Sequence, residues 1–383
     1  MKAREQAAAS AAPAVPWHVP AMVFASFAVI LGVYWDVSWH RSIGRDSFLS
    51  PPHVSIYLGG IVAGLACAVV VLRTSFAGTE AERAASVRFW RFFRGPLGAW
   101  VAIWGTFAML TSAPFDDWWH NAYGLDVEIL SPPHTVLALG IWAIQLGALL
   151  QVLALQNRGD AADGERFYRV AYAVTAGLVL LNVAIMSWEY QYRELMHQPL
   201  FYQVACGIYP LFLIGMAWAS RLRWRFTAAA AVYTLTVMAM IWVFPRFPAT
   251  PRLGPIEHMV DYLVAPDFPL LLVAPAFAMD LLARRGERWN RWALAAALGT
   301  TFFAVLLAVQ WIFADFLMSP LARNWFFGSH LTSDYGGLRP WEFDDYGGGT
   351  GGMITGLAIA LGISLVSARI GLGWGEWMRR VRR

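Results

Sequence analysis

The sequence predicts an all-α polytopic transmembrane helical bundle of about ten spans, with both the N- and C-termini on the cytoplasmic side. Three observations support this fold class. Of the 383 residues, 58% are hydrophobic and only 14% are charged; apolar runs of spanning length recur along the chain; and basic residues gather between alternate runs. Such a composition lies outside the range of soluble proteins of this size. We therefore expect a multi-pass protein of the cell's inner (plasma) membrane, with the lipid bilayer as its main partner.

The ten apolar runs are each about 16 to 23 residues long, close to the roughly 20 residues with which a helix crosses the hydrocarbon core. They cover residues 19–35, 54–72, 95–113, 135–155, 170–187, 200–220, 226–244, 268–283, 292–314 and 353–372. The eighth run contains Pro275 and Asp280. It is therefore the weakest of the predicted spans.

The basic residues report the topology of the chain. With the N-terminus inside, 22 of the 29 Lys and Arg residues fall in inside segments and 7 fall outside. This is the positive-inside pattern of membrane proteins. The net charge of +4 is thus explained by orientation in the bilayer, and we expect no nucleic-acid partner.

One motif occurs twice in the first half of the chain. It reads DVSWHRSIGRDSFLSPPH at residues 36–53 and DDWWHNAYGLDVEILSPPH at residues 116–134. Each copy has an aspartate, a histidine four residues later, and a second histidine that follows Ser-Pro-Pro and opens an apolar run. The candidate metal ligands are Asp36, His40, His53, Asp116, His120 and His134.

The spacing explains how each copy can form a metal site. Residues four apart lie one turn apart on the same face of a helix, so the aspartate and the first histidine can face one ion. The serine suits an N-cap and the first proline suits the first helical position, which places the second histidine in the first turn of the next helix. A helix-loop-helix hairpin returns that histidine to the first pair. One carboxylate and two imidazoles suit copper, non-heme iron or zinc and leave a position open.

Charged residues inside the two loops are candidates for an outer layer of groups that orients the histidines. These are Arg45 and Asp46 in the first copy, and Asp126 and Glu128 in the second; ordinary exterior salt bridges are the alternative for them. The alternative for each whole motif is an interfacial loop in which Asp, Trp and His cap helices and anchor at the headgroups. Because the motif is duplicated and completed each time by Pro-Pro-His, the metal interpretation is favoured. No catalytic residue is assigned.

Both stretches resemble the metal-binding stretches of one membrane-embedded component of the particulate methane and ammonia monooxygenases, the copper membrane monooxygenase family. That family's first stretch reads Asp-x-x-Trp-His, Arg-Asp, Pro-x-His, with twelve residues between the histidines, as in Asp36, Trp39, His40, Arg45, Asp46, Pro51 and His53. Its second reads Asn-x-Trp-x-His, an acidic pair, Ala-Pro-x-His, with thirteen between, and corresponds to Asp116, Trp118, His120, Glu128, Ser131, Pro132 and His134. The resemblance covers about residues 20–160, and Asp116 replaces the family's asparagine.

The resemblance implies copper as the cofactor and a monooxygenase-like oxidoreductase, or a subunit of one, that oxidises a small or lipid-soluble substrate with dioxygen. It also implies other membrane subunits and a cupredoxin-bearing partner, and a homo-oligomer is kept open. The alternative function is a non-catalytic copper-binding membrane protein for transport or assembly. A transporter should carry ionisable residues deep within several spans, whereas here they crowd at one edge, with Asp280 as the main exception.

The chain divides into three predicted parts. Residues 1–17 are expected to form a disordered cytoplasmic tail, residues 18–160 the helical half with the metal sites, and residues 161–383 a further transmembrane half of unassigned role. The two cysteines, Cys67 and Cys206, fall inside predicted spans. They are therefore expected to be small packing residues, without a disulfide framework.

Overall fold

The structure is a computed structural model that describes residues 15–44, 47–124, 131–158, 164–252, 260–286, 288–328 and 341–383. These ranges form long helices joined by short connections, with one small hairpin as the sheet. The elements are α2 (His18–Ser42), α3 (Pro51–Phe76), α4 (Glu80–Ala84), β1 (Val87–Phe89), β2 (Phe93–Gly95), α5 (Leu97–Tyr123), α6 (Pro132–Arg158), α7 (Glu165–Met186), η1 (Trp188–Tyr190), η2 (Arg193–Leu195), α8 (Pro199–Ala219), α9 (Arg225–Val243), η3 (Phe244–Arg246), α10 (Val273–Gly286), α11 (Arg291–Met318), η4 (Pro320–Ala322), η5 (Trp325–Phe327) and α12 (Gly349–Met378).

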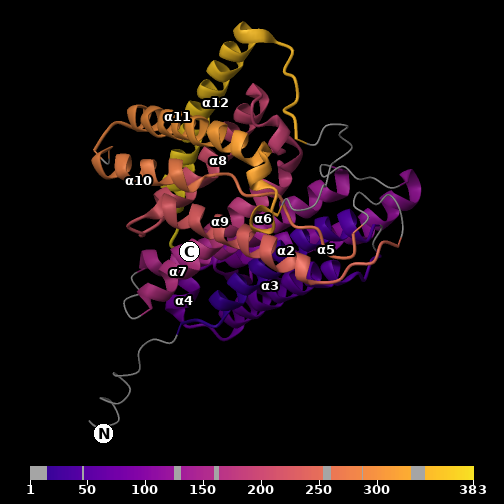
Figure 1. The fold of residues 1–383 in the computed structure, drawn as a ribbon. Helices are drawn as coiled ribbons and strands as arrows, with labels where there is room; N and C mark the ends of the chain where they lie inside the picture. The colour runs from indigo at the N-terminus through magenta and orange to yellow at the C-terminus, as the bar shows by residue number, and fades with distance from the viewer. Residues whose placement is uncertain are drawn as a thin grey trace.

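The helices are arranged around α7. Helices α2, α3, α5 and α6 lie together, α12 lies along α8, and α7 contacts α2, α6 and α9 (Figure 1). Most of α7 is buried by these neighbours. The four helices that carry the repeated motif thus form one group, joined to the later helices through α7.

Nine helices in the described part of the chain are long and apolar enough to cross a membrane: α2, α3, α5, α6, α7, α8, α9, α11 and α12. The predicted all-α polytopic bundle is confirmed. The eighth apolar run differs from the prediction of a full spanning helix. It forms α10, whose 14 residues make a helix of about 21 Å, shorter than the roughly 30 Å hydrocarbon core.

An extended segment, residues 263–272, precedes α10 and is largely buried. Backbone outside a helix is tolerated at membrane depth only where protein groups satisfy its hydrogen bonds. Ser38 Oγ donates to the Val264 carbonyl at 2.6 Å, and the Leu271 N–H donates to Gln310 Oε1 at 3.0 Å. Side chains of neighbouring helices therefore replace the helical hydrogen bonds that this segment lacks.

Asp280, the carboxylate near the inner end of the eighth apolar run, has a structural role. Its side chain is buried and accepts hydrogen bonds from the N–H and the hydroxyl of Thr227, at 2.9 and 2.7 Å. Thr227 lies in the first turn of α9, where backbone N–H groups have no intrahelical partner. The negative charge also suits the positive end of the helix dipole. Asp280 thus caps α9 from the neighbouring helix.

We expect Asp280→Ala to destabilise the protein by about 2 kcal/mol, because it leaves buried donors of α9 unsatisfied. Thermal unfolding of the purified protein in nanodiscs measures the loss. Asp280→Asn is the matched control, since its amide oxygen still accepts, and it should retain most of the stability. An Asp280→Ala protein that melts with the wild type would contradict the capping role.

Glycines set the close approach of α5 and α6. A Cβ on Gly105 would lie 2.6 Å from the carbonyl oxygen of Gly140, and one on Gly98 would overlap the carbonyl oxygen of Gly147. The two glycines of each helix are seven residues apart, so they lie on the same face of that helix. Small residues that let backbones touch are typical of helix pairs in membranes. The two helices that carry the second motif are therefore held at a fixed, short separation.

The C-terminus lies at the same end of the bundle as the start of α2. The antiparallel order α2, α3, α5, α6 returns the chain to its starting end, and Asn157, near the end of α6, donates to the carbonyls of Arg379 and Val381 at 3.1 and 2.8 Å. This agrees with termini on one side. The predicted tail, residues 1–17, lies mostly outside the described residues, which begin at Val15.

Candidate metal centre

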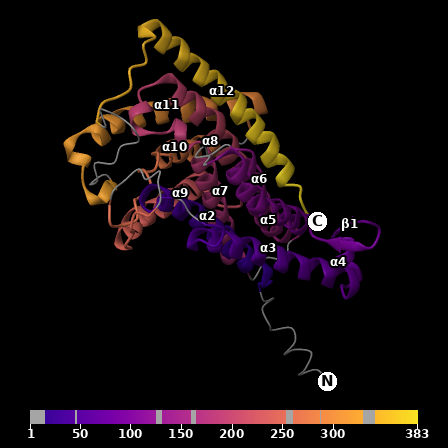
Figure 2. The same cartoon turned by 90° about the vertical axis from the view of Figure 1, so that its right-hand side faces the viewer.

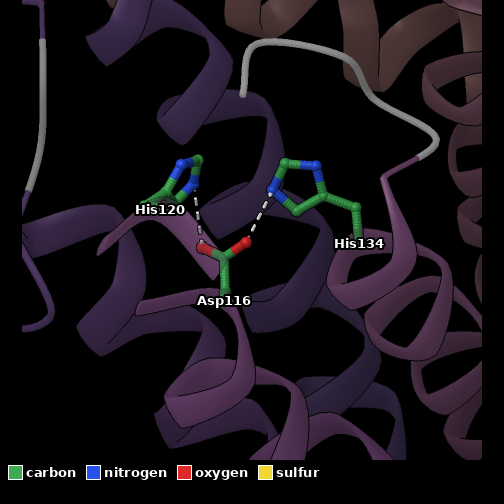
Figure 3. Close-up of side chains that lie close together, drawn as sticks. All are labelled: Asp116, His120 and His134. Atoms are coloured by element: carbon green, nitrogen blue, oxygen red, sulfur yellow. Dashed lines mark ion pairs between the residues drawn. The ribbon is translucent and has the colours of Figure 1, made fainter. Parts of the chain in front are cut away.

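The second copy of the motif forms a compact group at the meeting of α5 and α6. Asp116 and His120 lie one turn apart near the end of α5, and His134 is the third residue of α6. The carboxylate points between the two imidazoles (Figure 3). Its Oδ2 lies 3.5 Å from His120 Nε2, and its Oδ1 lies 3.4 Å from His134 Nε2. We call Asp116, His120 and His134 the second triad.

The distances within the second triad suit ligands of one ion. One ligand atom from each residue can be chosen so that all three lie within 4.8 Å of one another, and among the described residues this is the group of three that does so. Charge-assisted N–H···O hydrogen bonds are about 2.7–2.9 Å long, so the Asp116 contacts are longer than good hydrogen bonds. Two ligands on a tetrahedral ion with bonds of about 2.0–2.1 Å are about 3.3 Å apart.

One oxygen of the Asp116 carboxylate accepts no hydrogen bond in the described part of the chain, although it lies close to His134. Asp116 Oδ1 is closed to solvent and accepts no hydrogen bond from the described residues. A buried acceptor left in this state costs free energy. An ion placed between Oδ1 and the imidazoles would satisfy it. The side chains of the triad are 21 to 30% exposed, so other parts of the group face solvent.

Gly124 favours one tautomer of His120. Its carbonyl oxygen lies 3.3 Å from His120 Nδ1; because a carbonyl only accepts, this hydrogen bond forms in the tautomer that has its proton on Nδ1. Nε2, the nitrogen that faces Asp116, is then available as a metal ligand. Gly124 has φ +90° and ψ −172°, a region that is essentially restricted to glycine.

Gly124 was not predicted as a site residue, although the sequence carries a signal for it. A glycine follows the first histidine by four residues in both copies, and Gly44 and Gly124 have φ of +96° and +90°. Positive φ is the conformation for which glycine is the usual residue. In each motif the helix ends two or three residues after the first histidine, at Ser42 in α2 and at Tyr123 in α5.

We expect Gly124→Ala to lower the affinity for the metal by roughly tenfold or more, because it displaces the carbonyl that orients His120. Equilibrium competition with a chelator measures the affinity. Gly347→Ala is the matched control: Gly347 also has positive φ, +65°, and a Cβ there meets no atom within 4 Å. Equal affinities of the two variants would show that the Gly124 carbonyl does not orient the ligand.

The first copy of the motif repeats the arrangement in looser form. Asp36 Oδ2 lies 3.7 Å from His40 Nε2, and Asp36 Oδ1 lies 3.5 Å from His53 Nε2. His40 is 49% exposed, and the three ligand atoms do not meet the 4.8 Å limit that the second triad meets. We call Asp36, His40 and His53 the first triad. Metal ligation by either triad stays a prediction.

The local structure follows the sequence pattern. Helices α3 and α6 begin at Pro51 and Pro132, directly after the two serines, so His53 and His134 are third in their helices. Ser131 Oγ accepts from the His134 N–H at 3.4 Å. The Ser-Pro-Pro segment thus starts each helix where its histidine meets the preceding Asp/His pair.

The four residues predicted to orient the histidines, Arg45, Asp46, Asp126 and Glu128, lie outside the described residues. The described surroundings of the second triad are aromatic. Trp119 lies against Tyr123, with ring centroids 4.5 Å apart; Trp118 and Tyr123 are 54% and 68% exposed. Exposed Trp and Tyr at the end of a spanning helix are typical of the membrane–water interface. The second triad therefore lies at one end of the helix bundle, beside aromatic side chains of this kind.

A small pocket lies on another face of α2, between α2, η1 and the extended segment 263–272. The buried Arg41, next to His40 in sequence, lines it with Asp267 and Trp188. Trp188 Nε1 donates to Asp267 Oδ2 at 2.7 Å, and an Arg41 Nη lies 4.0 Å from the same oxygen. No residue of either triad lines this pocket. Arg41 instead ties the end of α2 to the second half of the chain.

Comparison of the chain with family models, with curated proteins and with solved structures finds no match. The resemblance to the copper membrane monooxygenases therefore stays an expectation from the two motifs. The fold and the geometry of the second triad are independent of it.

Proposed function

We propose that this membrane protein binds a copper ion at the second triad and acts as an oxidoreductase, or as a subunit of one, on a small or lipid-soluble substrate. The observation that carries the proposal is the Asp116 carboxylate between two imidazole nitrogens at 3.4 and 3.5 Å. A carboxylate with two imidazoles, and without thiolate, suits copper, non-heme iron or zinc. Copper is preferred because both motifs resemble those of the copper membrane monooxygenases.

The three residues of the second triad would provide different kinds of ligand to the ion. Asp116 contributes the negative charge, and His120 and His134 contribute neutral nitrogen ligands. The Gly124 carbonyl would keep the Nε2 of His120 directed to a bound ion. A bound copper ion would supply one-electron and dioxygen chemistry. The partial exposure of all three side chains leaves a coordination position for a reactant.

The position of the second triad fits a substrate that dissolves in lipid. The site lies at the end of a spanning helix, among exposed aromatic side chains at the bilayer edge. A substrate can therefore approach it from the membrane. Electrons would come from a partner, and the resemblance suggests a cupredoxin-bearing protein for this role.

A transport function has less support. A transport path needs ionisable residues within several spans, and Asp280, the main exception to their gathering at the other edge, caps α9. The capping of α9 is sufficient to explain this buried carboxylate without a transport role.

The proposal is tested by measuring dioxygen consumption by the purified protein in nanodiscs. Separate samples are loaded with copper, iron(II) or zinc, and each is supplied with ascorbate as reductant. We expect consumption in the copper arm above that of the metal-free protein and of a copper-treated His134→Ala variant. Proteoliposomes in a parallel arm measure passage of copper across the bilayer. Copper passage without metal-dependent consumption would overturn the oxidoreductase proposal in favour of transport.

A further inference from the structure

The hairpin between α3 and α5 forms a second surface, which combines basic and aromatic side chains. It lies at the opposite end of α5 from the second triad. Strands β1 and β2 pair antiparallel, with Phe89 opposite Phe93. The turn between them contains Trp90 and Arg91 at φ +47° and +66°, a backbone conformation that residues other than glycine rarely adopt. Figure 2 shows the hairpin beyond the helix ends, beside α4. We call residues 87–95 the basic hairpin.

The inner side of the basic hairpin is fixed to the spanning helices. Phe89 packs on Trp100 of α5, with ring centroids 5.1 Å apart, and Trp100 Nε1 donates to the Val87 carbonyl at 3.4 Å. On the α3 side, the Arg94 N–H donates to Ser75 Oγ at 2.7 Å. The hairpin is therefore held in place, and its outer side chains are presented in a fixed arrangement.

The outer side of the basic hairpin continues the lipid-facing surface of α5. Trp90 and Phe92 are 68% and 58% exposed, and so are Trp104 and Phe107 of α5, at 55% and 61%. Phe89 links the two sets, since its ring contacts both Trp90 and Trp104. Because α5 spans the membrane, Trp104 and Phe107 face lipid. The aromatic tip of the hairpin then lies at the level of the headgroups, where amphipathic rings are preferred.

Positive charge accompanies these aromatic side chains. Arg88 and Arg91 are exposed, and an Arg94 Nη donates to the Arg83 carbonyl at 3.2 Å. The opposing charges belong to Glu80 and Glu82 of α4. Glu82 lies 3.9 Å from Arg73 and accepts from the Thr79 N–H at 2.7 Å; this hydrogen bond lowers the pKa of the Glu82 carboxyl. The five arginines of this region, Arg73, Arg83, Arg88, Arg91 and Arg94, outnumber its two glutamates.

We propose that the basic hairpin binds the headgroup of an anionic phospholipid, with Trp90 and Phe92 inserted among the acyl-chain ends and Arg88 and Arg91 on the phosphate. Each part of the surface matches one part of such a lipid. Arginine side chains near an anionic membrane surface contribute about equally and additively to binding, and exposed rings contribute apolar area. This lipid site is separate from the metal centre and does not depend on it.

Native mass spectrometry of the full chain released from nanodiscs tests the proposal by counting retained phosphatidylglycerol. The nanodiscs contain phosphatidylcholine with a minor fraction of phosphatidylglycerol. We expect Arg88→Gln with Arg91→Gln to weaken phosphatidylglycerol binding roughly thirtyfold, from the loss of two arginines. The matched control is Arg380→Gln with Arg382→Gln, two exposed arginines at the same end of the bundle, which should retain the lipid as the wild type does.

Two further arms make the test specific. The double variant Trp90→Ser with Phe92→Ser keeps every arginine and should also lose the lipid. In pure phosphatidylcholine nanodiscs, both hairpin variants should melt at the temperature of the wild type. Inorganic phosphate at millimolar concentration should not displace the lipid. Wild-type retention by the arginine variant would overturn the proposal. Displacement by phosphate would overturn it as well, because the surface would then bind free anions.

Discussion

Replacing His134 by alanine is expected to lower the affinity of the second triad for copper by more than roughly a hundredfold, so that the purified protein loses the ion. The reason is the loss of one of three ligands, since groups that only orient a ligand are already worth about 10- to 100-fold. Metal analysis of the protein in nanodiscs, followed by electron paramagnetic resonance, measures the loss. Asp116→Ala should behave in the same way.

Two histidine variants serve as comparisons for His134→Ala. His197 is a matched control outside the triads: its ring stacks between Trp311 and Phe343, with centroids 4.2 and 3.8 Å away, so His197→Ala should lose packing but keep the metal. His53→Ala reports on the first triad, whose more open geometry predicts weaker binding. If His134→Ala keeps as much copper as His197→Ala, the ligand assignment is wrong.

Enlarging Gly105 to leucine is expected to destabilise the protein by about 1–3 kcal/mol through overpacking, and to release the metal as well. A side chain at this position cannot fit, since even its Cβ would lie 2.6 Å from the Gly140 carbonyl oxygen. Helices α5 and α6 must then separate. Because α5 carries Asp116 and His120 while α6 carries His134, a shift of about 1 Å is enough to loosen the site.

Gly362→Leu is the matched control for Gly105→Leu. Gly362 lies on α12, where a Cβ meets no atom within 4 Å, so the added side chain faces open space and stability should change little. Thermal unfolding and chelator competition, measured on the same samples, separate the two effects. A Gly105→Leu protein that keeps wild-type affinity would show that the α5–α6 separation does not set the site.

Much of the fold could be predicted because hydropathy and charge report directly on the bilayer. The spans and the starts of α3 and α6 at Pro51 and Pro132 follow from local patterns. The form of the eighth run could not be predicted, because its extended part depends on distant partners. Ser38 and Gln310, which satisfy its backbone, are far away in the sequence, and hydropathy does not indicate such contacts.

The sequence predicted which side chains would lie near one another, but not which of the two groups would be the tighter one. The two motifs share the Asp-x-x-x-His pair and the Ser-Pro-Pro-His sequence and differ by one residue in the spacing of their histidines, so they looked equivalent. In the structure, Asp116, His120 and His134 form the tighter group. The close approach of α5 and α6 at Gly105 and Gly140 is a long-range contact that the local pattern does not indicate. The use of Asp280 as a cap for α9 likewise depends on which helix lies beside it.

An anomalous-diffraction map of the copper-soaked protein tests the central claim most directly. We expect one strong peak about 2.0–2.2 Å from an Asp116 carboxylate oxygen and from the Nε2 atoms of His120 and His134, and no such peak in His134→Ala crystals. A map whose copper peaks all lie away from these three residues, from a protein that still carries copper, would contradict the claim that this carboxylate and its two imidazoles hold the ion.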